Sequence, residues 1–323
     1  MTSSMTAGSH KPTRRSVVSA DGTLIVYHEY ISPAPTSNHG PRPGLIILHN
    51  NFDSSRTYTD IAYRLWTSFN IYIPDRRGRG YSGHYQPNPE LQTEIDDLKA
   101  VLSDTQAQYV LGVGSGAMFA FYTALEVATS DSGLSIQKVA AFEPLVILEN
   151  DDNFGKLRKT LEQQTDGSSV DTLALHTAKK LTQTDERSWW QRMREKIRPS
   201  WLGREKANHT LILDQQRKGL YSMKNLFTPL KQECRMWPDV QRRFKTLLGL
   251  MEKNVEVLLI YGSESSHHRK MSPEAINKTL KKAKVVEFGG MGPSGLSNVV
   301  EGGEPERAAI ELRKFFIGYE EPR

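Results

Sequence analysis

The sequence predicts an α/β protein with a mostly parallel central sheet, flanking helices and a helical cap insertion before its last two strands. Short apolar runs alternate with amphipathic stretches, which is typical of buried parallel strands joined by crossover helices. Residues 150 to 245 are instead mostly polar and helical in pattern, without strand-like runs. The runs expected to form buried strands are G-L-I-I-L-H (44–49), N-I-Y-I-P (70–74), Y-V-L-G-V (109–113) and K-V-A-A-F (138–142). V-E-V-L-L-I-Y (255–261) and A-K-V-V-E-F (283–288) are expected to resume the sheet after the insertion.

The N-terminal part predicts a leader followed by a hairpin. Residues 1–15 are polar and lack the apolar stretch of a secretory signal, so we expect a disordered leader there. Two β-rich runs in residues 17–30 surround the Asp21-Gly22 turn and predict a β-hairpin, and a Pro-rich linker over residues 32–43 follows. The expected division is a core of residues 16–148 and 246–323, with residues 149–245 forming a helical cap or lid.

Composition restricts the classes of function. A chain of 323 residues with 37% hydrophobic and 24% charged residues is typical of a globular protein, and no segment approaches the ~20 apolar residues of a membrane span. The single cysteine, Cys234, excludes an intramolecular disulfide, and no Cys/His spacing indicates zinc. We therefore expect a cytoplasmic protein with no metal and no cofactor, and nothing in the sequence excludes a homodimer.

The formal net charge of +5 comes from scattered basic residues that many acidic residues accompany, so we expect no nucleic-acid partner. Residues 187–206 are the exception, because seven basic residues there interleave with three tryptophans. That pattern is compatible with nucleic-acid or membrane binding. It is equally typical of an amphipathic helix whose tryptophans face a pocket, which is the interpretation we favour.

The most informative segment runs from an apolar strand into an apolar helix over residues 107–121, A-Q-Y-V-L-G-V-G-S-G-A-M-F-A-F. Its glycines match the nucleophile elbow G-x-S-x-G, a sharp turn that lifts a serine above a parallel sheet. Gly114 stands where the serine belongs. A frame shifted to Ser115 would place Val113 and Ala117 where crowding demands glycine. The segment therefore predicts an elbow without a nucleophile.

The same G-V-G-S-G-A also satisfies the dinucleotide-binding fingerprint G-x-G-x-x-A, and Glu143 follows not far from the expected acidic residue. Such a fingerprint normally opens a nucleotide domain. Here two earlier strand ends carry motifs of another kind, so we treat the nucleotide interpretation as the weaker alternative.

Those motifs resemble the α/β-hydrolase superfamily over roughly residues 16–320. L-H-N-N-F-D-S-S-R-T-Y (48–58) is similar to the H-G-x loop of the family, and I-P-D-R-R-G-R-G-Y-S (73–82) is similar to its D-x-R-G-x-G-x-S turn. V-L-G-V-G-S-G-A (110–117) lies where the elbow belongs. The resemblance implies an α/β-hydrolase fold in which the inserted helices form a cap over the active site.

The resemblance also locates the catalytic triad, and all three positions have changed. Gly114 replaces the nucleophile, Ser265 the acid and Pro293 the histidine. Since triad chemistry requires a hydroxyl, a base and an orienting carboxylate, the resemblance implies the fold without the hydrolytic activity. The backbone N–H groups of Asn51 and Ser115 match the oxyanion-hole positions of the family, so a carbonyl could still be polarised.

Candidate acid and base groups are few. His267 and His268 follow the 255–261 strand and either point into the pocket or lie on a surface loop. Glu143 ends a strand, where some family members place an alternative acid, but a structural role is the interpretation we favour. We expect the pocket to be lined by His49, Asn50, Trp189, Trp190, Trp201 and Tyr221, although the cap aromatics would also suit the core of the cap itself.

The sequence thus predicts a protein of the α/β-hydrolase fold with a degenerate triad that acts on a small, apolar carbonyl compound under the cap. A non-hydrolytic enzyme of the cyclase, isomerase or lyase type, in specialised metabolism, is the first hypothesis. A non-catalytic small-molecule receptor or binding protein is the alternative. Residual hydrolysis through Ser115 is a further alternative.

Overall fold

The computed structural model describes residues 11–34, 41–51, 53–145, 254–265 and 267–319, together with seven residues between positions 229 and 240. Those seven are Pro229, Gln232, Glu233, Arg235, Met236, Asp239 and Val240. The cap aromatics Trp189, Trp190, Trp201 and Tyr221 lie outside the described residues, as does most of the expected cap of residues 149–245.

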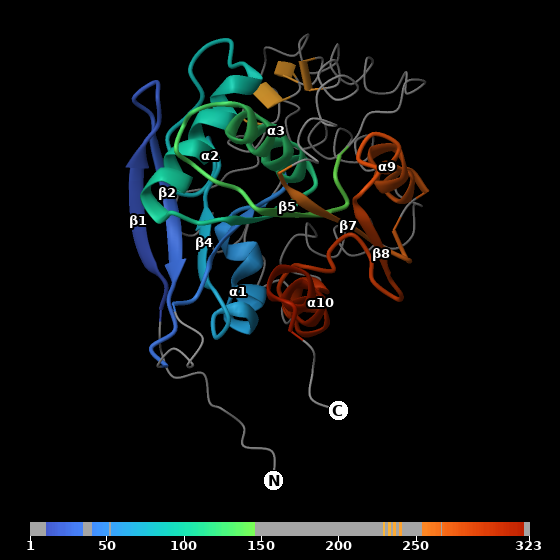
Figure 1. Ribbon diagram of the computed structural model, residues 1–323. Helices are drawn as coiled ribbons and strands as arrows, with labels where there is room; N and C mark the ends of the chain where they lie inside the picture. The colour runs from blue at the N-terminus through green and yellow to red at the C-terminus, as the bar shows by residue number, and fades with distance from the viewer. Residues whose placement is uncertain are drawn as a thin grey trace, which may run out of the picture.

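One eight-stranded sheet forms the centre of the described part of the chain (Figure 1). Its spatial order is β1-β2-β4-β3-β5-β6-β7-β8. The pairs β1–β2 and β2–β4 are antiparallel, and all other neighbouring pairs are parallel. The strands are β1 (Thr13–Val18), β2 (Leu24–Tyr30), β3 (Gly44–Leu48), β4 (Asn70–Pro74), β5 (Tyr109–Val113), β6 (Lys138–Phe142), β7 (Glu256–Gly262) and β8 (Lys284–Phe288).

The apolar runs predicted as strands all form strands, with bounds that agree within about one residue. The last of them, β8, is largely exposed and buries only Phe288. Strands β3 to β6 are buried almost end to end because helices cover both faces of the sheet, which explains their continuous apolar sequences. The predicted hairpin is also confirmed, but its first strand begins at Thr13, so residues 13–15 pair with β2 and do not belong to the expected leader. Its turn holds Gly22 at φ +84°, and Asp21 Oδ1 accepts a hydrogen bond from Thr23 N at 3.0 Å.

Helices cover the two faces of the sheet, as Figure 1 shows. α1 (Thr59–Leu65) and α10 (Pro305–Ile317) pack together on one face. α2 (Leu91–Thr105), α3 (Ser115–Thr129) and α9 (His267–Asn277) contribute to the apolar core on the other. Short 3₁₀ helices lie at Ser55–Tyr58 and Val299–Glu301.

Local signals fix several helix ends. A capping box joins Glu90 and Thr93 at the start of α2, and Pro305 opens α10, where its missing N–H costs nothing. Gly318 ends α10 in the left-handed conformation at φ 68°.

The parallel strands β3 to β7 all end at the same edge of the sheet, so the residues that follow them are brought together there.

Candidate active site at the strand ends

The turn between β5 and α3 has the backbone of a nucleophile elbow. Gly114 lies between the two elements at φ 56° and ψ −118°, a conformation that a residue with a side chain adopts only under strain. A Cβ on Gly112 would lie 2.3 Å from Ala117 Cα, and one on Gly116 would lie 2.4 Å from Leu48 O. The two flanking glycines are therefore required by close packing, and Gly114, not Ser115, occupies the turn.

The side chain of Asn50 fills the space that a nucleophile would need. A Cβ on Gly114 would lie 2.1 Å from Asn50 Oδ1 and 2.4 Å from Asn50 Cγ. Asn50 Oδ1 accepts a hydrogen bond from Ser115 N at 3.2 Å. Ser115 N–H, which the sequence places at an oxyanion-hole position, is therefore bound by the neighbouring amide in this structure. Asn51 N–H has no acceptor among the described residues.

The hydroxyl of Ser115 is not available as a nucleophile in this arrangement. Ser115 is completely buried, its Oγ accepts a hydrogen bond from Arg76 Nη1 at 3.0 Å, and it donates one to Asn51 Oδ1. Both described partners hold the hydroxyl in place, and neither is a base that could remove its proton.

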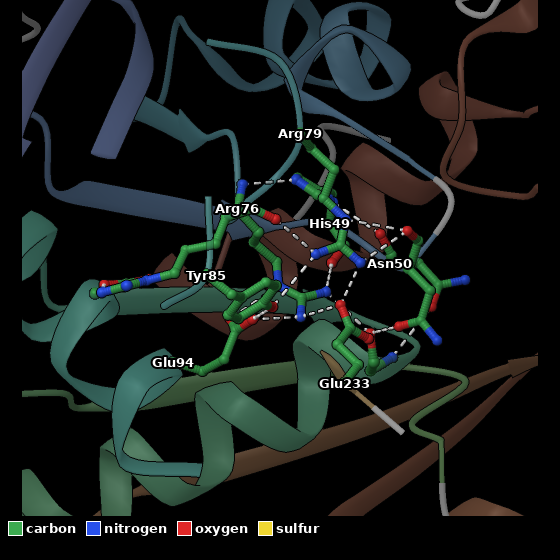
Figure 2. Close-up of polar contacts among 11 residues, drawn as sticks. His49, Asn50, Arg76, Arg79, Tyr85, Glu94 and Glu233 are labelled. Carbon is green, nitrogen blue, oxygen red and sulfur yellow. Dashed lines mark hydrogen bonds and ion pairs between the residues drawn. The ribbon is translucent and has the colours of Figure 1, made fainter. Parts of the chain in front are cut away.

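Two buried arginines of the turn after β4 organise the floor of the site (Figure 2). Arg76 makes a bidentate pair with Glu94, with Nε–Oε2 at 3.0 Å and Nη2–Oε1 at 2.9 Å. Arg79 donates to Asn51 O from Nη2 at 3.0 Å and from Nε at 3.2 Å. Both guanidinium groups also bind Glu233 Oε1. The network therefore connects the elbow to a residue of the expected cap.

The charges of this network balance one another. Burial lowers the pKa of Arg76, but the carboxylates of Glu233 and Glu94 outweigh that effect and raise it. Burial raises the pKa of Glu94, but the charge and hydrogen bonds of Arg76, together with the charge of Arg79 and a hydrogen bond from Tyr85, lower it below its ordinary value. Two guanidinium groups and two carboxylates are thus in direct contact, and their opposite charges offset the cost of burial.

His49 supports this floor. Its Nε2 accepts a hydrogen bond from Arg76 N at 2.9 Å, so the proton lies on Nδ1, which donates to Asn50 O at 2.8 Å. Burial, followed by the charges of Arg76 and Arg79, lowers the pKa of His49 to about 3. The imidazole is therefore neutral, and both of its ring nitrogens are bound to the backbone.

Ser265, at the position expected for the acid, belongs to a second cluster of hydrogen-bonded side chains around Glu143. Glu143 follows β6 at φ 46° and is buried; its Oε1 accepts hydrogen bonds from Ser265 Oγ and, at 3.3 Å, from Gly262 N. Its Oε2 accepts from Arg269 Nη1 at 2.9 Å. These contacts support the structural interpretation of Glu143, since both carboxylate oxygens are bound.

Solved structures of similar architecture cover most of the chain. An alpha/beta hydrolase from Sphaerobacter thermophilus matches with a TM-score of 0.53 at 19% identity, over 84% of this chain and 91% of that one. A haloalkane dehalogenase from Bradyrhizobium elkani matches with a TM-score of 0.61 at 17% identity, over 95% and 98%. A thermophilic esterase from Thermogutta terrifontis gives 0.60 at 15%, over 94% and 97%. No protein-family model and no curated protein matches the chain.

The protein has the α/β-hydrolase fold. Within this fold, the histidine position falls in the turn after β8, where Pro293 is half-buried and Gly295 N donates to Gly292 O at 3.0 Å. His267 begins α9 and is exposed to solvent, and the side chain of His268 lies outside the described residues. The described structure thus joins Asn50, Asn51 and Ser115 at one place, and His267 makes no hydrogen bond to them among the described residues.

Sequence reasoning missed Glu94 and Glu233 as members of the α/β-hydrolase site. The signal that could have found them was the charge of the D-R-R-G-R-G turn, because buried arginines need carboxylate partners. That signal names no partner, and Glu233 lies 157 residues from Arg76.

In the described ranges no cluster of three or more His, Cys, Asp or Glu residues could hold a metal. None of the helices described there is long and apolar enough to span a membrane.

Proposed function

We propose that this protein is non-hydrolytic and acts on a small, largely apolar carbonyl compound by cyclase, isomerase or lyase chemistry. The observation that carries the proposal is the pairing of Gly114 with Asn50, which puts an amide where a hydrolase has its nucleophile. An amide cannot form an acyl-enzyme, but it can donate hydrogen bonds to a carbonyl oxygen.

Asn50 is oriented for such a role. Because Ser115 N–H fixes Oδ1, the planar amide also fixes the direction of Nδ2, which has no acceptor among the described residues. Asn51 N–H is a second donor of the same kind. A ligand carbonyl bound by these groups would have its developing enolate charge stabilised without covalent attack. His267 and His268 remain the proposed proton-transfer residues, and Glu143 could serve only after releasing Arg269.

The first experiment compares a small-molecule extract incubated with and without the purified protein, by mass spectrometry. We expect a feature to be converted into a product of equal mass or of a mass lighter by one water. Asn50→Asp keeps an oxygen for Ser115 N–H but removes the Nδ2 donors, so it should lower the conversion rate by about 10²-fold to 10³-fold. Asn254→Asp makes the same chemical change at an exposed position and should have no effect. Equal rates for both variants would contradict the role of Asn50.

A binding protein is the second candidate, and one observation favours it. The described carboxylate nearest to the expected acid position, Glu143, is held by Arg269 and Ser265 and is not free for proton transfer. In that case the Asn50 and Asn51 donors would hold a ligand without converting it. A compound that co-purifies with the protein unchanged, together with no turnover of any extract component, would favour this candidate over the enzyme.

Hydrolysis through Ser115 makes a separate prediction. A fluorophosphonate probe should leave the intact mass of this protein unchanged, because the Ser115 hydroxyl is buried and bound by Arg76 and Asn51. A serine esterase in the same reaction provides the positive control. A mass increase that disappears in Ser115→Ala would revive the hydrolase hypothesis.

A further inference from the structure

Arg76 and Arg79 converge on a single carboxylate oxygen directly beside the elbow. Glu233 Oε1 accepts from Arg76 Nη2 at 2.6 Å and also from Arg79 Nη2. The side chains of both arginines are no more than 2% exposed. In Figure 2, Glu233 and Asn50 lie on the opposite side of the two guanidinium groups from Tyr85 and Glu94. The two arginines therefore form a buried, preorganised clamp for a carboxylate.

The two arginines differ in their other charge partners. Arg76 is also neutralised by Glu94, through a bidentate contact. Among the described residues, Arg79 has no carboxylate partner other than Glu233. Without the Glu233 carboxylate, the clamp would hold one uncompensated positive charge in a buried site, which strongly favours the binding of another anion.

Glu233 satisfies this clamp incompletely. Its Oε2 has no hydrogen-bond partner in the described structure, although the residue is completely buried. A buried carboxylate oxygen without a donor is unfavourable, so an occupant that could place both oxygens against donors would compete well. The clamp also contacts the elbow, because Arg76 Nη1 donates to Ser115 Oγ and Arg79 donates to Asn51 O.

We propose that Arg76 and Arg79 form a carboxylate-binding site, that Glu233 occupies it from within the chain, and that the carboxylate of a ligand displaces Glu233. The ligand is then a carbonyl compound that also carries a carboxylate, with the carboxylate at the arginines and the carbonyl at Asn50. This assignment of the ligand class rests on the proposed function, whereas the binding of a simple carboxylate does not. Glu233 acts as a built-in competitor, and its removal increases the affinity of the site for carboxylates.

The test uses acetate, which is small enough to replace the removed part of Glu233 and carries no carbonyl function besides its carboxylate. Glu233→Ala should lower the Tm, and acetate should raise it again by about 4 °C when present at ~100 times its dissociation constant. Wild-type protein should respond at least about tenfold more weakly to the same acetate concentrations, because Glu233 competes. Glu264→Ala removes an exposed carboxylate and should respond to acetate only as weakly as the wild-type protein.

Acetamide has the shape of acetate without its charge and should not restore Glu233→Ala, nor should sodium chloride at the same ionic strength. The double variant Arg79→Met with Glu233→Ala removes both charges, so it should fold and show no acetate response. Equal effects of acetate and acetamide, or an acetate response that persists in the double variant, would overturn the proposal. A Glu233→Ala protein that stays unfolded in acetate would also overturn it, because an open carboxylate site should refill. None of these measurements depends on turnover, so they fail or succeed independently of the proposed function.

Discussion

Placing a serine side chain at Gly114 tests whether Asn50 has taken over the space of the nucleophile. A new Cβ would lie 2.1 Å from Asn50 Oδ1 and 2.4 Å from Asn50 Cγ, at a backbone φ of 56°. Overpacking of this kind costs about 1–3 kcal/mol, and a non-glycine residue in the left-handed region costs about 1–2 kcal/mol more. Gly114→Ser should therefore lower the free energy of unfolding by about 2–5 kcal/mol, measured by urea denaturation.

A second variant separates the two contributions. Gly133 has φ 71° with no atom within 4 Å of an added Cβ, so Gly133→Ser measures the backbone cost alone, about 1–2 kcal/mol. Asn50→Ala removes the clash at Gly114 and leaves Ser115 N–H without its acceptor, which costs about 1–3 kcal/mol.

The double variant Asn50→Ala with Gly114→Ser should then be more stable than the sum of the single variants predicts, by about 1–3 kcal/mol. Additive effects, or a Gly114→Ser variant no less stable than Gly133→Ser, would refute the inference that the Asn50 amide occupies the place of the nucleophile.

Three further predictions concern the residues around the elbow. The pKa of His49 is about 3 in the folded protein, against the ordinary value of 6.5. Below about pH 6.5 the unfolded chain therefore binds a proton that the folded chain excludes, so the free energy of unfolding should fall by about 1.4 kcal/mol per pH unit. Urea unfolding between about pH 7 and about pH 5 should show a smaller pH dependence of stability in His49→Gln than in the wild-type protein. An equal pH dependence in both proteins would contradict the low pKa of His49. Gly80→Ala should lower the free energy of unfolding by about 3 kcal/mol, since its Cβ would lie 1.9 Å from Asp75 Oδ2 at φ 52°; a loss below about 1 kcal/mol would be inconsistent with that contact. Arg269→Met should cost about 3 kcal/mol by leaving the buried Glu143 carboxylate without its ion pair, whereas Arg269→Lys should lose less, and equal losses would count against the pair.

The core of this fold was predictable because its signals are local. Continuous apolar runs identify strands that are covered on both faces, so β3 to β7 appear in the sequence at nearly their observed bounds. The turn at Gly114 was predictable for the same reason, since the glycines at 112 and 116 are required by contacts with backbone at fixed positions of the strand-to-helix unit. That the turn carries glycine at position 114 follows from residue identity alone.

The contents of the site were decided by tertiary structure. Asn50 comes from the end of β3 and Ser115 from the start of α3, so no spacing rule shows that the amide of one would cap the N–H of the other. Glu143 and Arg269 are 126 residues apart, and Arg76 and Glu233 are 157 residues apart. Periodicity reports which face of an element is buried, but it carries no information on which charged side chain from a distant segment will meet another. Only the folded chain brings two arginines onto one carboxylate oxygen beside the elbow, because the parallel strands end at a common edge and Glu233 reaches that edge from a segment outside the sheet.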